Sequence, residues 1–133
     1  MRGSNRMDNI NLTNSEWYVL DCLWERSPMT VMELVAALGE RPGWAKSTTI
    51  TTLRRMEEKG LVRMEQGPRG KLYSPAVERE RAVIAETHSF LDRVYQGSVG
   101  LMMSAMAQRQ ELSREEIAQL REILNRAEEE GGK

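Results

Sequence analysis

The sequence is poor in the residues that build catalytic and metal sites. Its 133 residues include one cysteine, Cys22, and one histidine, His88, so no internal disulfide and no His or Cys pair at metal-ligand spacing can form. A glycine-rich phosphate loop is also missing. We therefore expect no catalytic activity, no metal and no cofactor. Cys22 is expected to be a buried structural thiol, and His88 to lie on a helix surface or in a packing contact.

Long hydrophobic runs are missing as well. No run approaches the about 18 apolar residues that are needed to span a bilayer. The N-terminal residues also lack the hydrophobic core of a signal peptide. We therefore expect a cytoplasmic protein without membrane insertion, whose length fits one domain of ordinary size or one compact domain with a smaller appendage.

The net charge of −1 conceals an uneven distribution of charge along the chain. Residues 41–73 hold eight basic and three acidic side chains, a local balance of +5. Residues 1–40 hold three basic and six acidic side chains, and residues 111–133 hold four and seven. A local positive excess is expected of a DNA-binding face, because neutralisation of phosphates supplies much of the sequence-independent affinity.

The basic segment contains a stretch, residues 46–60, that combines helical spacing with four threonines. Threonine is a mediocre helix former because its branched Cβ restricts χ1. A sequence that accepts this cost has either strong tertiary support or a use for the hydroxyls. With Ser47 as the N-cap, helical spacing places four polar side chains on one face: Thr48, Thr51, Thr52 and Arg55. A thinner apolar stripe lies elsewhere on the helix: Ile50, Leu53 and Met56.

Hydroxyls and an arginine on an exposed helix face suit a groove of DNA. Hydroxyls hydrogen-bond base edges or phosphates, threonine methyls pack on thymine methyls, and arginine can make two hydrogen bonds to guanine. The side chains predicted to read bases are Thr48, Thr51 and Arg55. Those predicted to make phosphate or flanking contacts are Lys46, Ser47 and Thr52. Trp44, which precedes this helix, is expected to pack on the core rather than to touch the DNA backbone.

Capping signals predict two helices before this one. Thr13 and Thr30 each begin a capping box with a glutamate three residues later. The first helix is expected to end near Arg26, and the second to have Gly39 at its C-cap. The second helix and the threonine helix, joined by a turn at residues 41–43, form a helix-turn-helix candidate.

A basic hairpin is predicted after the threonine helix. Residues 61–66 alternate apolar and polar side chains, residues 71–74 can pair back onto them, and residues 67–70 supply the turn. Arg69 and Lys71 at the tip are expected to bind phosphate. The predicted fold is therefore mostly α with a small β-hairpin: a winged helix-turn-helix DNA-binding domain followed by a C-terminal helical dimerisation domain.

Residues 77–127 are expected to form three helices with apolar stripes, Pro75 lying in the first turn of the first and Ser113 capping the last. About fifty residues is small for a self-sufficient core, so we expect this half to pack against a second copy in a homodimer. The alternative is a monomer in which it folds back on the winged helix. The expected dimerisation residues are Phe90, Leu91, Val94, Leu101, Met102, Met106, Ile117, Leu120 and Leu124.

The expected division of the chain is a disordered segment at 1–11, a winged-helix domain at 12–76, a dimerisation domain at 77–127 and a frayed tail at 128–133. A symmetric dimer would set two threonine helices about one helical turn apart on a duplex. It would therefore select a pseudo-palindromic operator in double-stranded DNA.

The chain resembles the penicillinase-repressor and methicillin-resistance-repressor family of bacterial winged-helix regulators. The resemblance runs from Leu12 to about Ala127. The residues that carry it are Leu12–Trp17, Leu23–Trp24, Thr30–Leu34, Trp44, Thr48, Thr51, Leu53, Arg55, Lys59–Val62, Leu72–Pro75, Glu111–Ile117 and Leu120–Leu124. Single pieces such as Lys59–Val62 are common among winged helices, whereas the ordered set is specific.

The resemblance implies a homodimeric repressor of an operator, often that of a β-lactamase operon together with the repressor's own gene. In the best-known members, a membrane sensor protease responds to β-lactam, and the repressor is then cut within its dimerisation half. The matching bond here is Ala105–Met106, where those members have an Asn-Phe pair, so this chain departs from the pattern. Paired cysteines of a copper-responsive branch are also missing, which argues against copper sensing.

A second hypothesis is a protein-interaction module that uses the basic face of residues 41–73 for an acidic protein partner. Sequence-selective binding to DNA at moderate salt distinguishes the two hypotheses, because only the repressor requires it.

Overall fold

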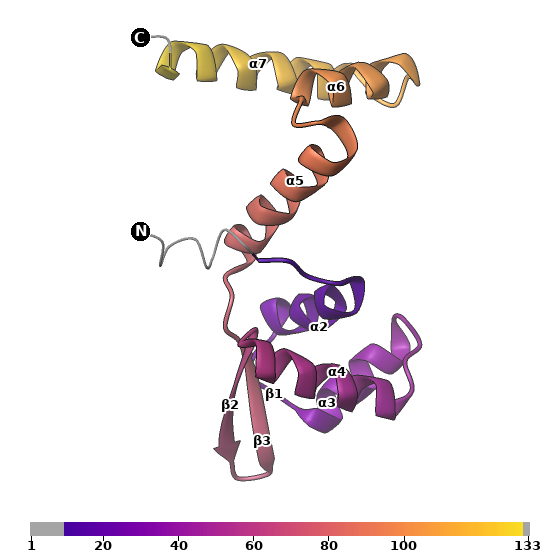
Figure 1. Ribbon diagram of the computed structural model, residues 1–133, viewed down its shortest axis with the longest axis vertical. Coiled ribbons are helices and arrows are strands. Elements are labelled where there is room, and N and C mark those ends of the chain that lie inside the picture. The colour runs from indigo at the N-terminus through magenta and orange to yellow at the C-terminus, as the bar shows by residue number, and fades with distance from the viewer. Residues whose placement is uncertain (1–9, 132–133) are drawn as a thin grey trace. The chain divides into compact units, whose positions relative to one another are not determined.

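A computed structural model of the chain describes residues 10–131 and contains helices and three strands (Figure 1). The elements are α2 (Asn14–Glu25), β1 (Met29–Thr30), α3 (Val31–Glu40), α4 (Lys46–Lys59), β2 (Val62–Gly67), β3 (Gly70–Pro75), α5 (Arg79–Tyr95), α6 (Val99–Gln108) and α7 (Arg114–Gly131). They form two compact units, and the boundary between the units lies after Thr87, within α5.

Both predicted capping boxes at the start of the chain are confirmed. Before α2, the Thr13 N–H donates to the Glu16 carboxylate over 2.9 Å, and the Glu16 N–H donates to the Thr13 hydroxyl over 3.2 Å. Thr30 and Glu33 make the same pair of bonds before α3, over 2.9 and 3.1 Å. The predicted C-cap at Gly39 is wrong, because α3 continues to Glu40.

Helix α4 begins two residues earlier than expected, at Lys46 rather than at Thr48. Its N-cap is Ala45, which makes no side-chain hydrogen bond, so the predicted Ser47 cap is wrong. The N–H groups of Thr48 and Thr49 instead donate to the Ala45 carbonyl, which starts the helical ladder upstream of Ser47. The helix ends at Gly60, whose φ of 78° is a left-handed conformation that glycine adopts without a steric penalty.

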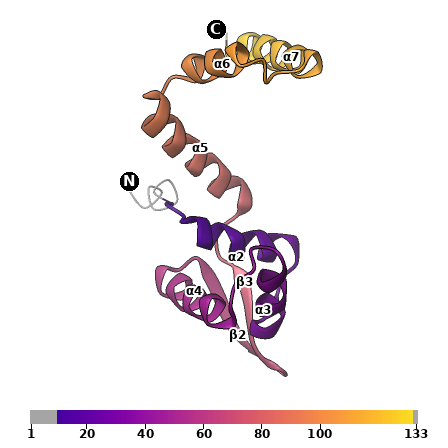
Figure 2. The ribbon, with the colours of Figure 1, turned by 90° about the vertical axis from the view of Figure 1, so that its right-hand side faces the viewer.

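The predicted hairpin is confirmed, and a short third strand joins it. Strands β2 and β3 pair antiparallel from Val62 opposite Pro75 to Gly67 opposite Gly70. Strand β1 adds to the free edge of β3, which gives the order β1-β3-β2. Pro75 therefore lies at the end of β3, and its predicted place in the first turn of a helix is wrong. Both ribbon views show the hairpin extending beyond the helices (Figures 1 and 2).

Apolar side chains from the three helices and the sheet form the core of the first unit. The fully buried members of greatest volume are Leu20 and Leu23 from α2, Leu34 and Leu38 from α3, and Leu53 and Met56 from α4. Tyr73 of β3 closes the core on the side of the sheet, at 4% exposure. The core therefore fixes one face of α4 and leaves the opposite face to solvent.

The ends of the first unit differ from the expected domain bounds. Ile10 packs against the core, so the disordered segment expected at residues 1–11 does not include Ile10. Residues 1–9 lie outside the described residues. Val77 and Ala82 belong to the same core, and the Trp24 indole N–H donates to the Val77 carbonyl over 2.9 Å. The first unit therefore continues past residue 76 into α5.

The second unit has capped helices but no buried residue in α6 or α7. The Ser98 hydroxyl accepts from the Leu101 N–H over 3.0 Å at the start of α6. Ser113 and Glu116 form the predicted capping box before α7. Helix α7 continues to Gly131, so the fraying expected from Glu128 is wrong, and residues 132–133 lie outside the described residues. Between residues 10 and 131, no helix has the length and apolar character required to cross a membrane.

Candidate nucleic-acid interface

Helix α4 presents one buried and one exposed face. Thr49, Thr52, Leu53 and Met56 are at most 3% exposed. The predicted contact residues Lys46, Ser47, Thr48, Thr51 and Arg55 are all exposed. Thr52 is the exception: at 3% exposure it belongs to the buried face, so its predicted place on the polar face is wrong. It lies three residues after Thr49 and four before Met56, a spacing that aligns all three on the core side.

Arg54 belongs to the exposed face and was missed by the sequence prediction. Its side chain is exposed, and it lies seven residues after Ser47 and three after Thr51, so the three share one side of the helix. Helical spacing predicts that Arg54 is exposed, but only once Thr49, Leu53 and Met56 are known to face the core. The exposed face therefore carries two adjacent arginines, Arg54 and Arg55, rather than one.

The hairpin places further cationic side chains at its tip. Arg69 lies in the two-residue turn between β2 and β3, and Lys71 follows in β3, both exposed. The turn is tight: a Cβ atom at Gly67 would lie 2.6 Å from a methyl carbon of Leu72. The pKa of the Glu33 carboxyl is lowered, first by the Thr30 backbone N–H and further by the Arg26 and Arg69 guanidiniums.

The turn before α4 is held by aromatic packing. Trp44 is partly buried and packs against the core, which confirms its predicted role. Its N–H donates to the Leu38 carbonyl over 3.0 Å, and its ring lies edge-on to Tyr18 at a centroid distance of 6.0 Å. These contacts fix the chain immediately before the N-terminus of α4.

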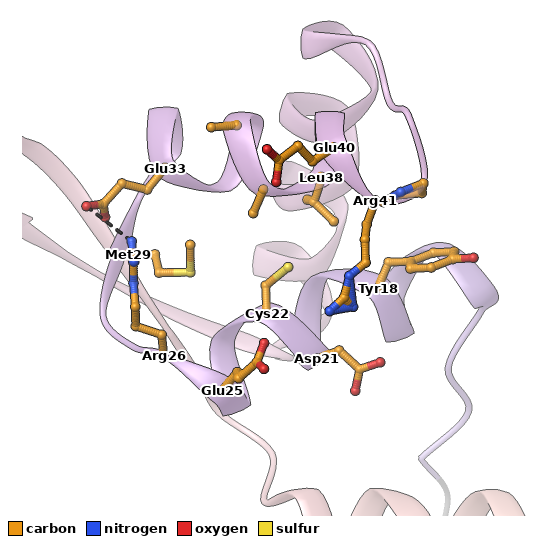
Figure 3. Close-up of a pocket in the computed structure, with 13 residues that line it drawn as sticks. Tyr18, Asp21, Cys22, Glu25, Arg26, Met29, Glu33, Leu38, Glu40 and Arg41 are labelled. Carbon is orange, nitrogen blue, oxygen red and sulfur yellow. Dashed lines mark ion pairs between the residues drawn. The ribbon is translucent and has the colours of Figure 1, made fainter.

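A groove of about 470 Å³ lies between α2 and α3, and none of its lining residues belongs to α4 (Figure 3). Figure 3 shows Cys22 pointing from α2 into this groove, with the Arg41 side chain beside it. Cys22 is partly rather than fully buried. Burial raises the pKa of its thiol, Arg41 opposes the shift, and Asp21 and Glu25 add to it. Among the described residues, no group of three or more His, Cys, Asp or Glu side chains has metal-binding geometry.

Most residues expected to mediate dimerisation are exposed apolar side chains of the second unit. Phe90, Val94, Leu101, Met106, Ile117 and Leu124 are 38–65% exposed, whereas Leu91, Met102 and Leu120 are partly buried. Val99 and Ile123, at 55% and 56%, add to the exposed apolar surface.

Ala105 and Met106, which form the possible cleavage bond, lie inside α6, so a protease that cut there would have to unwind this helix. His88 is exposed on α5.

Three packed helices, a basic hairpin and an exposed helix face of hydroxyls and arginines define a winged helix-turn-helix DNA-binding unit. A solved structure with this fold, a MepR mutant of Staphylococcus aureus bound to an oligodeoxyribonucleotide, matches with a TM-score of 0.50 and 21% identity. The match covers 92% of this chain and 81% of that chain.

The sequence comparisons are more specific than the fold. The family model of the penicillinase repressor matches residues 12–126, so the chain belongs to this family of DNA-binding transcriptional repressors. The penicillinase repressor of Bacillus licheniformis is 29% identical over 113 residues, which cover 85% of this chain and 88% of the relative. The methicillin resistance regulatory protein MecI of Staphylococcus aureus is 24% identical over 122 residues, which cover 90% and 99%.

Proposed function

We propose that the chain represses transcription as a homodimer that places two copies of α4 in successive major grooves of a pseudo-palindromic operator. The observation that carries this proposal is the division of α4 into two faces. Thr49, Leu53 and Met56 fix the helix to its unit, and the opposite face presents hydroxyls and arginines to solvent. A DNA groove satisfies such a face with base edges and phosphates.

Each exposed group has a proposed task. The side chains assigned to base edges are Thr48, Thr51 and Arg55. Those assigned to phosphates or flanking positions are Lys46, Ser47, Arg54, Arg69 and Lys71. Thr52 has no task in DNA binding, because its side chain faces the core. The proposed target genes are those of β-lactam resistance, an assignment supported by the names of the relatives.

The experiment begins with selection of duplexes from a randomised pool by the wild-type chain. The selected duplex and a scrambled duplex are then compared by fluorescence anisotropy at moderate salt. We expect the selected duplex to bind at least about 1,000-fold more tightly, as specific sites typically do. Equal binding of the two duplexes would overturn the repressor function and favour an acidic protein as the partner of the basic face.

The variant Arg55→Ala tests the proposed base contact. We expect a loss of about 1–3 kcal/mol on the selected duplex and a relaxed preference at one base position, because a bidentate contact discriminates between bases. Arg121→Ala is the matched control, since Arg121 is an exposed arginine on α7. A loss of equal size on every duplex would assign Arg55 to phosphate instead.

A further inference from the structure

An ion pair joins the first turn of α2 to the last residue of α4. The Glu16 Oε2 atom lies 2.7 Å from Lys59 Nζ, and the Glu16 side chain is completely buried. Lys59 keeps 41% of its side chain exposed. The second carboxylate oxygen, Oε1, accepts the Thr13 backbone N–H over 2.9 Å. Both oxygens of Glu16 therefore have a partner, one local and one from a distant helix.

Two other capping glutamates of the chain can be compared with Glu16. Three glutamates occupy the same position of a capping box: Glu16 before α2, Glu33 before α3 and Glu116 before α7. Glu33 and Glu116 are exposed, and only Glu16 is buried against a lysine of another element. Capping does not require a charge, because glutamine serves equally in this motif. Burial of a carboxylate is costly, so the capping role alone does not account for Glu16.

The position of Lys59 makes the pair relevant to α4 as a whole. Lys59 is the last residue of the helix, immediately before the left-handed Gly60. Within residues 10–131, no other ion pair joins α4 to another element. The contacts of Leu53 and Met56 are hydrophobic and non-directional, whereas a charged hydrogen bond is directional. On the sheet side, Tyr73 of β3 is buried, and its pKa is raised by that burial and by the nearby charge of Glu57 in the last turn of α4.

We propose that Glu16 and Lys59 form a positioning pair, which sets the rotation and axial position of α4 and thereby aligns its exposed side chains with base edges. This inference rests on the proposed function. A rotation of about 15° moves side-chain ends at a radius of about 6 Å by about 1.5 Å, which is more than base readout tolerates. The pair therefore contributes to DNA sequence selectivity without touching DNA through Glu16.

The test uses two charge-removing variants of similar shape, Glu16→Gln and Lys59→Met. Glutamine keeps the capping bond, and methionine keeps the aliphatic length of lysine. The double variant Glu16→Gln/Lys59→Met leaves no unpaired charge in the interior, so it is expected to fold even if a single variant does not. Glu33→Gln makes the same chemical change at the exposed capping glutamate and is the matched control.

The measurements are the affinity ratio of the wild-type-selected duplex to a scrambled duplex, the salt dependence of binding, and the base preferences in a new selection. All are made at a temperature at which circular dichroism shows the variant to be folded. We expect the ratio to fall at least about tenfold in Glu16→Gln and in the double variant, with an unchanged salt slope on scrambled DNA. Glu33→Gln should keep the ratio within about twofold.

The outcomes separate three cases. A lower unfolding midpoint with an unchanged ratio and unchanged base preferences would make the pair merely structural and overturn the proposal. A defect with a reduced salt slope in both variants that carry Lys59→Met, but not in Glu16→Gln, would assign Lys59 to a phosphate and also overturn it. Failure of the wild-type chain to discriminate between the duplexes would instead contradict the proposed function, before any variant is compared.

Discussion

At the scale of single residues, the buried hydroxyl of Thr49 is the least satisfied group of α4. Thr49 is 0% exposed, and its Oγ1 atom has no hydrogen-bond partner among the described residues. Valine has nearly the same shape without the polar atom. We expect Thr49→Val to raise the free energy of unfolding by about 1 kcal/mol, because an unpartnered buried hydroxyl costs stability. Urea unfolding followed by circular dichroism measures the change.

Thr48→Val is the control for this substitution. Thr48 is exposed on the same helix, so its change should alter the free energy of unfolding by less than about 0.5 kcal/mol. A decrease in stability in Thr49→Val would mean that the Thr49 hydroxyl has a partner in solution.

The Cys22 thiol gives a second prediction at this scale. Burial raises its pKa, so the thiolate is disfavoured in the folded state. The stability that follows is fully present below the unfolded pKa of about 8.5 and is lost as pH rises through the higher folded value. Between pH 7 and 10, the urea midpoint should therefore fall more in the wild type than in Cys22→Ser. Tyr73, whose pKa is also raised, contributes equally to both chains.

The same shift predicts slow chemistry at Cys22. Because only the thiolate attacks a disulfide reagent, the folded chain should react more slowly at pH 8 than the chain in denaturant. Equal rates in the two states would contradict the burial of this thiol.

At the scale of elements, the hairpin is the part whose role in DNA binding can be separated from sequence readout. We expect Arg69→Ala/Lys71→Ala to weaken binding to all duplexes alike and to reduce the slope of log K against log salt by about 2. Each phosphate contact contributes about 0.9 to that slope. The selectivity ratio should stay unchanged, since phosphate contacts contain no base information.

Arg114→Ala/Arg121→Ala, which removes two exposed charges from α7, is the control for the hairpin variant. It should leave the slope unaltered. An unaltered slope in the hairpin variant itself would place the wing outside the interface.

The elements themselves were largely predictable because local signals define them. Thr13 and Thr30 begin helices through capping boxes that involve only the next three residues, and the Gly67–Gly70 turn defines the hairpin. Strand β1 was not predictable, because two residues have no periodicity and join the sheet only by pairing with Leu72 and Tyr73, far along the chain.

The candidate interface was predictable in type but not in every residue. The basic wing and the hydroxyl-rich helix follow from sequence, whereas the distinction between Thr52 and Arg54 requires knowledge of which side of α4 faces the core. The buried face includes Thr49 and Thr52, so threonines lie on both faces of α4. Hydrophobicity alone therefore does not distinguish the buried face from the exposed one. The pairing of Glu16 with Lys59 had no local signal, since the two residues are 43 positions apart.

At the scale of the whole molecule, the two units differ in how they use apolar residues. The first unit buries most of its leucines in a shared core, whereas α6 and α7 bury none. Yet these helices are capped by Ser98 and Ser113, so their ends are specified as in a folded domain. Capped helices with exposed apolar side chains are typical of a surface that a partner covers. A second copy of the chain is the partner that the proposed operator symmetry requires.

This dimer can be tested by placing a charge on its proposed surface. The wild-type chain should sediment as a dimer at micromolar concentration. Leu124→Glu should raise the dissociation constant of the dimer at least about 100-fold, or about 2.7 kcal/mol, because an unpaired carboxylate would be buried at the interface. Leu124 is 65% exposed in the single chain, so the substitution should leave the first unit folded.

Gln119→Glu adds the same charge at another exposed position of α7 and is the control. It should remain dimeric if the effect at Leu124 comes from burial in the dimer rather than from charge alone. The Leu124→Glu monomer should still contact a half-site through α4, but it should lose the affinity that comes from holding two half-sites at once. A wild-type chain that sediments as a monomer would exclude the two-half-site operator while leaving the recognition of one half-site by α4 intact.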